Sequence, residues 1–337
     1  GMPGGVNVLT TEIYRSIQEV PPRLGYASAF SVVMLIAMSV LLFFYGRISR
    51  HAERYASITG KGYRPRPFRL GRGRWVAGAV ILLNFIIVLV LPFSALFWVA
   101  CQPFVRPMRW AGVHTLTMKQ FDAVFSSPSY LQLGINTLVV AVGTATVAMA
   151  LTAATGWLAA RRQIGGRLVD QLVTIPLVFP GLVLGVALLE FALKLPIPIY
   201  GTLWIIGIAF LICYMPYGMR YCYAGVLQIH PELEQAAGVA GAGTGTAIRR
   251  IVAPLLWPSI ASGWLFIFLL CAKEMALPLL LAGPDSQTIS VAMFDLWTNG
   301  QGGEVAALGL LWAGLMTIFA GAFYVLMRRH SAKAFGK

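Results

Sequence analysis

The chain has 337 residues, of which 58% are hydrophobic and only 11% are charged. Soluble globular domains carry about 25% charged residues. A mean hydropathy of +0.75 therefore excludes an ordinary soluble enzyme and a disordered chain. The formal net charge of +14 would suit a nucleic-acid-binding protein, but the basic residues fall in gaps between long apolar runs rather than on a water-facing fold. The composition indicates a polytopic membrane protein that binds no nucleic acid.

Seven apolar runs are long enough to cross the hydrocarbon core of a bilayer, which takes about 20 residues of helix. Six of them contain no charged residue, and the exception holds Lys273 and Glu274 side by side. We therefore predict an all-α polytopic fold with seven transmembrane helices, at residues 24–46, 76–101, 130–160, 171–189, 195–219, 259–281 and 305–327.

The basic residues predict the orientation of these spans. Alternate loops, at 46–75, 161–170, 220–250 and 328–337, carry 19 of the 26 Lys and Arg residues, and the loops on the other side carry 6. Lys and Arg concentrate in cytoplasmic loops. We therefore expect the N-terminus of this chain on the outside and its C-terminus in the cytoplasm.

An outside N-terminus predicts a further span before this sequence. We therefore expect residues 1–45 to hold a periplasmic segment and the last helix of a preceding transmembrane region. Residues 46–75 carry nine Lys and Arg together with glycines and prolines, a composition that favours a cytoplasmic linker between domains. An ordinary basic loop between helices is the alternative interpretation of this segment.

Helix breakers and one ionisable pair mark the later spans. Pro180, Pro216 and Pro278 free backbone carbonyls, which must be satisfied inside protein or along a wet cavity. Lys273 and Glu274 are costly in a membrane, so they are expected to face protein or water. These five residues are candidates for a translocation path, and a partly exposed pair near a broken stretch before Pro278 is an equally weighted alternative. Adjacent helical residues point about 100° apart, so Lys273 and Glu274 should find partners on neighbouring helices.

The sequence predicts no catalytic site and no metal site. The four cysteines form no C-x-x-C pair, and the four histidines show no ligand spacing. A phosphate-binding G-x-x-x-x-G-K-[ST] motif is missing, so the chain is not expected to hydrolyse ATP.

A cytoplasmic segment at residues 231–258 is the most informative part of the sequence. Pro231 can start a helix, and Glu232 and Glu234 complement its N-terminal dipole. Glycines at 241, 243 and 245 predict a turn. A second helix is expected to begin near Thr246 and to end against Pro254 and Pro258. The prediction is a short helix, a turn and another helix on the cytoplasmic face.

This segment resembles the EAA loop of type I ABC importer permeases, in which Glu-Ala-Ala is followed at fixed spacing by Gly, Ile and Leu-Pro. Gln235 replaces the Glu of that pattern, Ala253 replaces its Leu, and Glu234 can supply the acid. By this resemblance, the residues that couple the permease to an ATPase are Glu234, Gln235, Ala236, Ala237, Gly241, Ala242, Ile251 and Pro254.

The resemblance implies the remaining features of the protein. The last six helices would form the permease domain, at residues 76–330, followed by a cytoplasmic tail at 331–337, in a multi-pass protein of the bacterial inner membrane. Its partners would be an ABC ATPase dimer, a periplasmic solute-binding protein and a second permease half fused N-terminally. ATP would be used by the partner subunits, with no cofactor on this chain.

The overall layout resembles that of fused ferric iron permeases, which predicts ferric iron as the substrate. Polyamine and phosphonate permeases share similar segments and remain alternatives. A secondary transporter, which would need no ATPase, is the rival from another class, and it would be favoured by inverted repeats that this sequence does not show.

Overall fold

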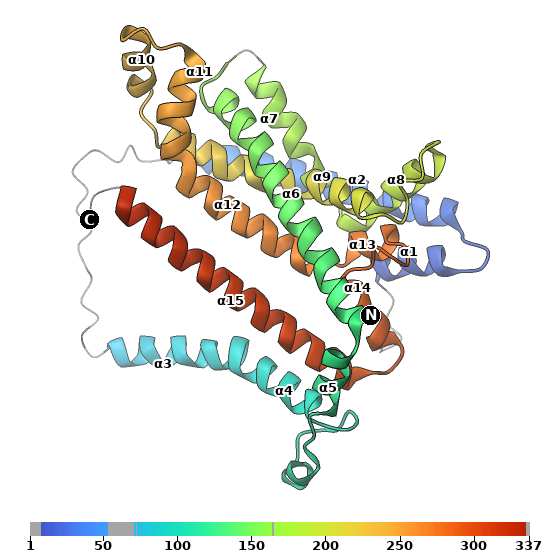
Figure 1. Cartoon of the computed structure of the whole chain (residues 1–337). Coiled ribbons are helices and arrows are strands. Elements are labelled where there is room, and N and C mark those ends of the chain that lie inside the picture. Colours follow the sequence, from blue (N-terminus) through green and yellow to red (C-terminus); the bar gives the residue numbers. More distant parts are fainter. Residues whose placement is uncertain (1–7, 53–70, 72, 164, 335–337) are drawn as a thin grey trace. The chain divides into compact units, whose positions relative to one another are not determined.

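The computed structural model describes residues 8–52, 71, 73–163 and 165–334, and most of them lie in helices (Figure 1). The chain divides into two compact units. Unit 1 contains residues 1–39, 129–292 and 315–337, and unit 2 contains residues 40–128 and 293–314. Within the described residues the only β contact is an isolated parallel bridge between Gly201 and Ala282. The predicted all-α class is confirmed.

Six helical segments of the described chain are long and apolar enough to cross a membrane, and a bent pair of helices makes a seventh. This agrees with the seven predicted spans. The six segments are Leu24–Leu41 within α2 (Leu24–Ala52), Gly73–Ala100, α6 (Pro128–Ala160), α9 (Leu203–Leu227), Thr244–Lys273, and Gly302–Arg329 within α15 (Gly302–Ala334).

The fourth predicted span, at residues 171–189, is not one straight helix. It consists of α7 (Gly166–Thr174), a 3-10 turn and α8 (Gly181–Lys194), with a bend of 102°. Pro180 precedes α8 with φ −58° and ψ 141°, an extended conformation that stops the helix. The predicted span is therefore a bent pair of helices, and the helix-breaking prolines of this segment are the physical reason.

The helix after the turn at residues 241–243 does not end at Pro254 and Pro258, contrary to the prediction. It begins as α11 (Thr244–Ala247), passes through a π-helical turn at Ile248–Val252, and continues as α12 (Ala253–Lys273). Proline lacks an N–H, and its ring clashes with the carbonyl four residues earlier. The wider π turn directly before Pro254 relieves that clash.

A second π turn lies in the same relation to a proline. Ile86–Val90 separates α3 (Gly73–Phe85) from α4 (Leu91–Ala100), and Pro92 follows it. In both cases the apolar helix continues past a proline, a residue that usually ends a helix.

The core of unit 1 lies between α6, α9, α12, α8 and α13 (Ala276–Leu281). Its largest buried side chains include Phe210, Phe268, Met149, Ile206 and Ile267. Glycines allow α9 and α12 to approach closely. A Cβ atom at Gly225 would lie 2.5 Å from Ser259 Oγ. Small residues at such contacts allow tight helix packing within a membrane.

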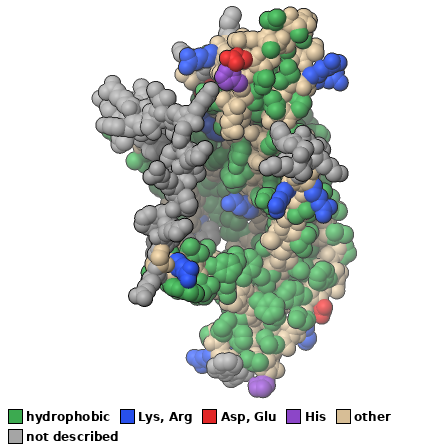
Figure 2. All heavy atoms as spheres, turned by 90° about the vertical axis from the view of Figure 1, so that its left-hand side faces the viewer, with side chains coloured by type: hydrophobic (Ala, Val, Ile, Leu, Met, Phe, Trp, Pro, Cys, Tyr) green, Lys and Arg blue, Asp and Glu red, His purple; other side chains and the backbone are tan. Residues whose placement is uncertain are grey.

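The remaining helices complete the two units. In unit 1, α1 (Leu9–Gln18) buries Ile13 completely, and Ser28 of α2 donates a hydrogen bond of 2.8 Å to Glu190 of α8. Unit 2 includes α5 (Lys119–Ser126), and α14 (Ile289–Thr298) crosses the boundary between the units. Most of the predicted linker at 46–75 lies outside the described residues. Hydrophobic side chains predominate on the face drawn in Figure 2, as expected for a chain that meets lipid.

Candidate functional site

The cytoplasmic segment predicted from the sequence forms a short helix, a turn and a second helix, as expected. The first helix is α10 (Glu232–Val239), which follows Pro231 and has Glu232 and Glu234 in its first turn. Its N-terminal dipole favours these two acidic residues. In Figure 1, α10 and α11 lie together beyond the N-terminal end of α12.

The turn after α10 depends on Gly241. Its φ is +83°, a left-handed conformation that residues with a side chain rarely adopt, and a Cβ atom built there would meet nothing within 4 Å. The backbone conformation, and not crowding, therefore explains the glycine. Ala240 ends α10, and Gly243 precedes α11 with an ordinary φ of −68°.

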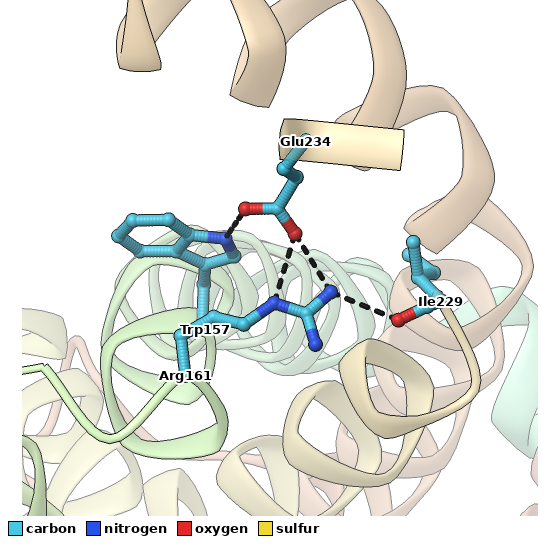
Figure 3. A network of polar contacts seen from close by, with 4 residues as sticks. All are labelled: Trp157, Arg161, Ile229 and Glu234. Carbon is cyan, nitrogen blue, oxygen red and sulfur yellow. Dashed lines mark hydrogen bonds and ion pairs between the residues drawn. The ribbon is translucent and has the colours of Figure 1, made fainter. Parts of the chain in front are cut away.

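The carboxylate of Glu234 faces the protein interior (Figure 3). It accepts hydrogen bonds from Arg161 Nε at 2.8 Å and from Trp157 Nε1 at 3.1 Å, and it forms an ion pair with a terminal guanidinium nitrogen of Arg161 at 2.7 Å. The side chains of Arg161 and Glu234 are only 11% and 16% exposed. Charge-assisted bonds of this kind are about twice as strong as neutral ones.

Arg161 also binds the segment that leads into α10. Its terminal nitrogen donates to the carbonyl oxygen of Ile229 at 2.9 Å (Figure 3). Trp157 belongs to α6, and Arg161 follows the last residue of that helix. The network therefore connects α10 to the end of one transmembrane helix and to the chain that leaves α9.

A small apolar cluster supports the network. Val226, Ile229, Val252 and Leu256 are buried together, and Trp157, Ala160 and Ile260 pack against them. This cluster connects the ends of α6 and α9 to the start of α12. A displacement of α10 should consequently move these helix ends rather than bend the loop alone.

The outward side of α10 is exposed and mostly apolar. Leu233 is 46% exposed and Val239 is 93% exposed, and Gln235 and Ala236 are also exposed. Exposed apolar residues on one short helix at a water boundary are typical of a protein-binding surface. Of the other predicted coupling residues, Ala237, Ala242 and Ile251 are half-buried, and Pro254 is exposed.

Sequence reasoning missed Arg161 and Trp157. They lie 73 and 77 positions before Glu234. Arg161 was counted only as one of the cytoplasmic basic residues, and Trp157 fell inside an apolar span. No spacing in the sequence connects either residue to the loop.

The second group of candidates lies where α12 ends. Lys273 is the last residue of α12 and is exposed, and Glu274 follows with an extended backbone. Glu274 accepts a hydrogen bond from the hydroxyl of Tyr214 on α9 and another at 2.9 Å from the backbone N–H of Ala276. Its carbonyl oxygen accepts a hydrogen bond from Ser290. The side-chain partner of Glu274 lies on a neighbouring helix, as predicted, although the extended backbone of Glu274 means that helix geometry is not the reason.

The three candidate prolines occupy different settings. Pro180 lies at the bend before α8, Pro216 is buried inside an unbroken α9, and Pro278 is buried in the first turn of α13. Only Pro180 marks a sharp break. Among the described residues, no three His, Cys, Asp or Glu side chains come together as a metal site would require.

The helical spans and the anchored loop define a transport permease, a component that conducts a solute rather than a catalytic enzyme. The family of binding-protein-dependent transport system inner membrane components matches residues 152–335. The chain belongs to this family, the permeases of ABC importers.

Similar proteins include ferric and polyamine permeases. The ferric transport system permease protein FbpB of Actinobacillus pleuropneumoniae is 27% identical over 91% of this chain and 44% of its own length. The spermidine/putrescine transport system permease protein PotC of Escherichia coli strain K12 is 24% identical over 66% of this chain and 82% of its own length. The chain thus spans less than half the length of the ferric permease that it matches.

A solved structure shares the fold. A bacterial ABC transporter involved in the import of the acidic polysaccharide alginate aligns with a TM-score of 0.61 and 17% identity, over 77% of this chain and 96% of that chain. The same kind of transporter, in complex with an alginate pentasaccharide-bound periplasmic protein, aligns with a TM-score of 0.60.

Proposed function

We propose that this chain is the permease part of an ABC importer, in which α10 receives motion from an ATPase subunit and passes it to the transmembrane helices. The observation that carries this proposal is the side-chain network of Glu234, Arg161 and Trp157. It holds a short helix rigidly against the end of α6 while the other side of that helix remains open to a partner. Rigid-body motion of a packed element is a common way to drive a conformational switch.

The partner would be an ABC ATPase dimer that uses ATP, while this chain would bind no cofactor. The exposed Leu233, Ala236 and Val239 would enter an apolar groove of one ATPase subunit. This assignment requires α10 on the cytoplasmic side, which agrees with the Lys and Arg distribution and places the N-terminus of the chain in the periplasm. A periplasmic solute-binding protein would deliver the solute on the opposite side.

Residues 76–330 would form the permease domain, after a linker at 46–75 and before a tail at 331–337. Residues 1–45 would include the last helix of a second permease half, fused N-terminally. The match to FbpB supports this arrangement, because it extends over 91% of this chain but only 44% of the relative.

Ferric iron is the solute we propose. Two ferric permease relatives match 91% and 86% of this chain, while the polyamine permease PotC matches 66% of it. Uptake of labelled ferric iron and of labelled spermidine into cells that depend on this transporter distinguishes the two. Uptake of spermidine alone would overturn the iron assignment and leave the permease assignment standing.

The coupling role is tested at Gly241. Because φ is +83° there, Gly241→Val should distort the turn and lower uptake per ATP hydrolysed by about tenfold or more, with membrane insertion unchanged. Gly243→Ala is the matched control, since that glycine has an ordinary φ and open space around it. Normal coupling in Gly241→Val, or failure of any ATPase subunit to co-purify with the chain, would contradict the proposal.

A further inference from the structure

The membrane-spanning helices α9 and α12 carry polar side chains on one shared exposed side. The two helices pack through glycines, and a Cβ atom at Gly218 would lie 2.7 Å from Thr152 Oγ1 of α6, while one at Gly263 would lie 2.8 Å from Met149 Cε of α6. These contacts fix which sides of α9 and α12 face the protein interior. The surface of α9 and α12 that faces away from α6, which we call the open side, is therefore exposed in unit 1.

The cytoplasmic part of this open side contains a hollow of about 470 Å³. Arg220, Tyr221 and Gln228 line it from α9, and Ser259 and Ser262 line it from α12. Arg220 also donates a hydrogen bond of 3.4 Å to Thr174 Oγ1. Ala224, Gly225 and Pro258 complete the lining, and the guanidinium of Arg220 within it favours water over lipid chains.

Three aromatic rings lie beside the hollow on the same two helices. Phe266 of α12 lies between Tyr217 and Tyr221 of α9, with ring centroids 5.7 Å from each. Tyr217 and Phe266 are each 37% exposed, so their rings reach the open side. Tyr217 also lies 6.2 Å from the ring of Tyr214, which leads toward Glu274.

Glu274 lies at the other end of this row, beside the middle of α9. Its partner Tyr214 is adjacent to the midpoint of the 25-residue helix α9. Here α12 breaks off, and a broken helix at the midplane is typical of solute sites in transporters. An ionisable residue at that depth faces protein or water and not lipid.

Another exposed helix surface in the same unit has the opposite character. In the part of α15 that belongs to unit 1, Leu315, Ile318 and Val325 are exposed at 46%, 71% and 47%. All three are apolar and suit contact with lipid chains. The exposed polar side chains of α9 and α12 therefore distinguish these two helices from α15.

We propose that this surface, which we call the path face (Tyr217, Arg220, Tyr221, Gln228, Ser259, Ser262, Phe266 and Glu274), is the wall along which the hydrophilic solute and its water cross the membrane, with the buried Tyr214 holding Glu274 from behind. The rings of Tyr217, Tyr221 and Phe266 form a constriction between the Glu274 site and the cytoplasmic hollow. The occupant is therefore the transported solute, and neither lipid nor a packed helix of the second permease half. This inference rests on the proposed importer function.

The test uses cysteine labelling in the full importer, reconstituted in vesicles with its ATPase subunits. Cys213, which lies beside Tyr214, is first replaced by Ala. Ser262→Cys and Phe266→Cys are then introduced singly, with Ile318→Cys on the apolar side of α15 as the matched control, and a membrane-impermeant cationic thiosulfonate is the probe. Gln228→Cys is a second probe of the hollow if Ser262→Cys does not insert.

The probe reacts with the thiolate form of cysteine, which forms only where water reaches the thiol. The cysteine in Ser262→Cys should therefore react about tenfold or more faster than the one in Ile318→Cys. Phe266→Cys should react at a rate that changes when ATP is added, because the constriction opens and closes. Equal slow rates at positions 262, 228, 266 and 318, together with normal ATP-driven uptake, would overturn the path face while the importer function stands. Fast labelling at 262 with no ATP-driven uptake by the parent importer would instead contradict the proposed function.

Discussion

Glu234 and Glu274 both lie where the helical structure is interrupted, and their carboxylates bind different kinds of donor. Glu234 on α10 is paired with the cation of Arg161 and also accepts a hydrogen bond from the indole N–H of Trp157. Glu274, directly after α12, accepts hydrogen bonds only from neutral donors, the Tyr214 hydroxyl and the Ala276 N–H, among the contacts that the structure gives its carboxylate.

This difference indicates that the Glu234 contact is hard to separate and the Glu274 contact is easy to separate. Removing Arg161 from Glu234 would leave a poorly hydrated charge without a counterion, so that contact resists change. Separating Tyr214 from Glu274 breaks a hydrogen bond and leaves no cation unpaired. A rigid contact suits the transfer of motion from a partner, and a contact that opens readily suits a site that a solute must pass.

The largest effect is expected from Arg161→Met. Breaking a buried ion pair costs about 3–5 kcal/mol, and the partial exposure of both side chains brings the expected loss to about 2–3 kcal/mol. Uptake per ATP hydrolysed should fall as well, because α10 loses its connection to α6. Thermal unfolding in detergent and a coupled uptake assay measure the two effects.

Arg162→Met is the matched control for this change, since Arg162 is the exposed neighbour of Arg161. The reversed pair, Arg161→Glu with Glu234→Arg, should recover part of the stability if the ion pair itself matters. Equal thermal stability of Arg161→Met and Arg162→Met would show that the ion pair with Glu234 does not hold α10 in place.

An intermediate effect is expected at Glu274. Tyr214→Phe removes one of two donors to the carboxylate and should cost about 1–2 kcal/mol. Glu274→Gln keeps an oxygen that can accept from the Ala276 N–H and should cost less, about 1 kcal/mol. Thermal unfolding ranks the two variants, and uptake assays show whether the negative charge is needed for transport.

The control for this pair is Tyr217→Phe, which keeps the ring that faces Phe266 and removes only a hydroxyl. If Glu274→Gln proved as destabilising as Arg161→Met, Glu274 would have a cationic partner in the assembled importer, and the contrast between the two glutamates would disappear.

The membrane fold was predictable from the sequence because long apolar runs have few alternatives in a bilayer. Helix boundaries were not. The run at 171–189 contains a 102° bend, whereas Pro254 and Pro258 lie within a continuous helix. Whether a proline ends a helix depends on the backbone around it, such as the π turn before Pro254, and that information is not in the residue type.

The site was predictable only where its residues are near in sequence. The α10 turn was expected from Pro231, Glu232 and the glycines, which act locally. The inward direction of Glu234 was not, because its partners lie 73 and 77 positions earlier on another helix. Packing of α6 against the loop decides that contact, and single-sequence patterns carry no such information.

The smallest effect, and the sharpest comparison of the two glutamates, is expected from Trp157→Phe. Like Tyr214→Phe, it removes one donor to a carboxylate and leaves an aromatic ring in place. Glu234 keeps its ion pair with Arg161, so the loss should be only about 0.5–1 kcal/mol, less than for Tyr214→Phe. Thermal unfolding of the two variants side by side makes the comparison. A larger loss for Trp157→Phe would mean that the indole, through its N–H or through its packing on the apolar cluster, contributes more than the Tyr214 hydroxyl.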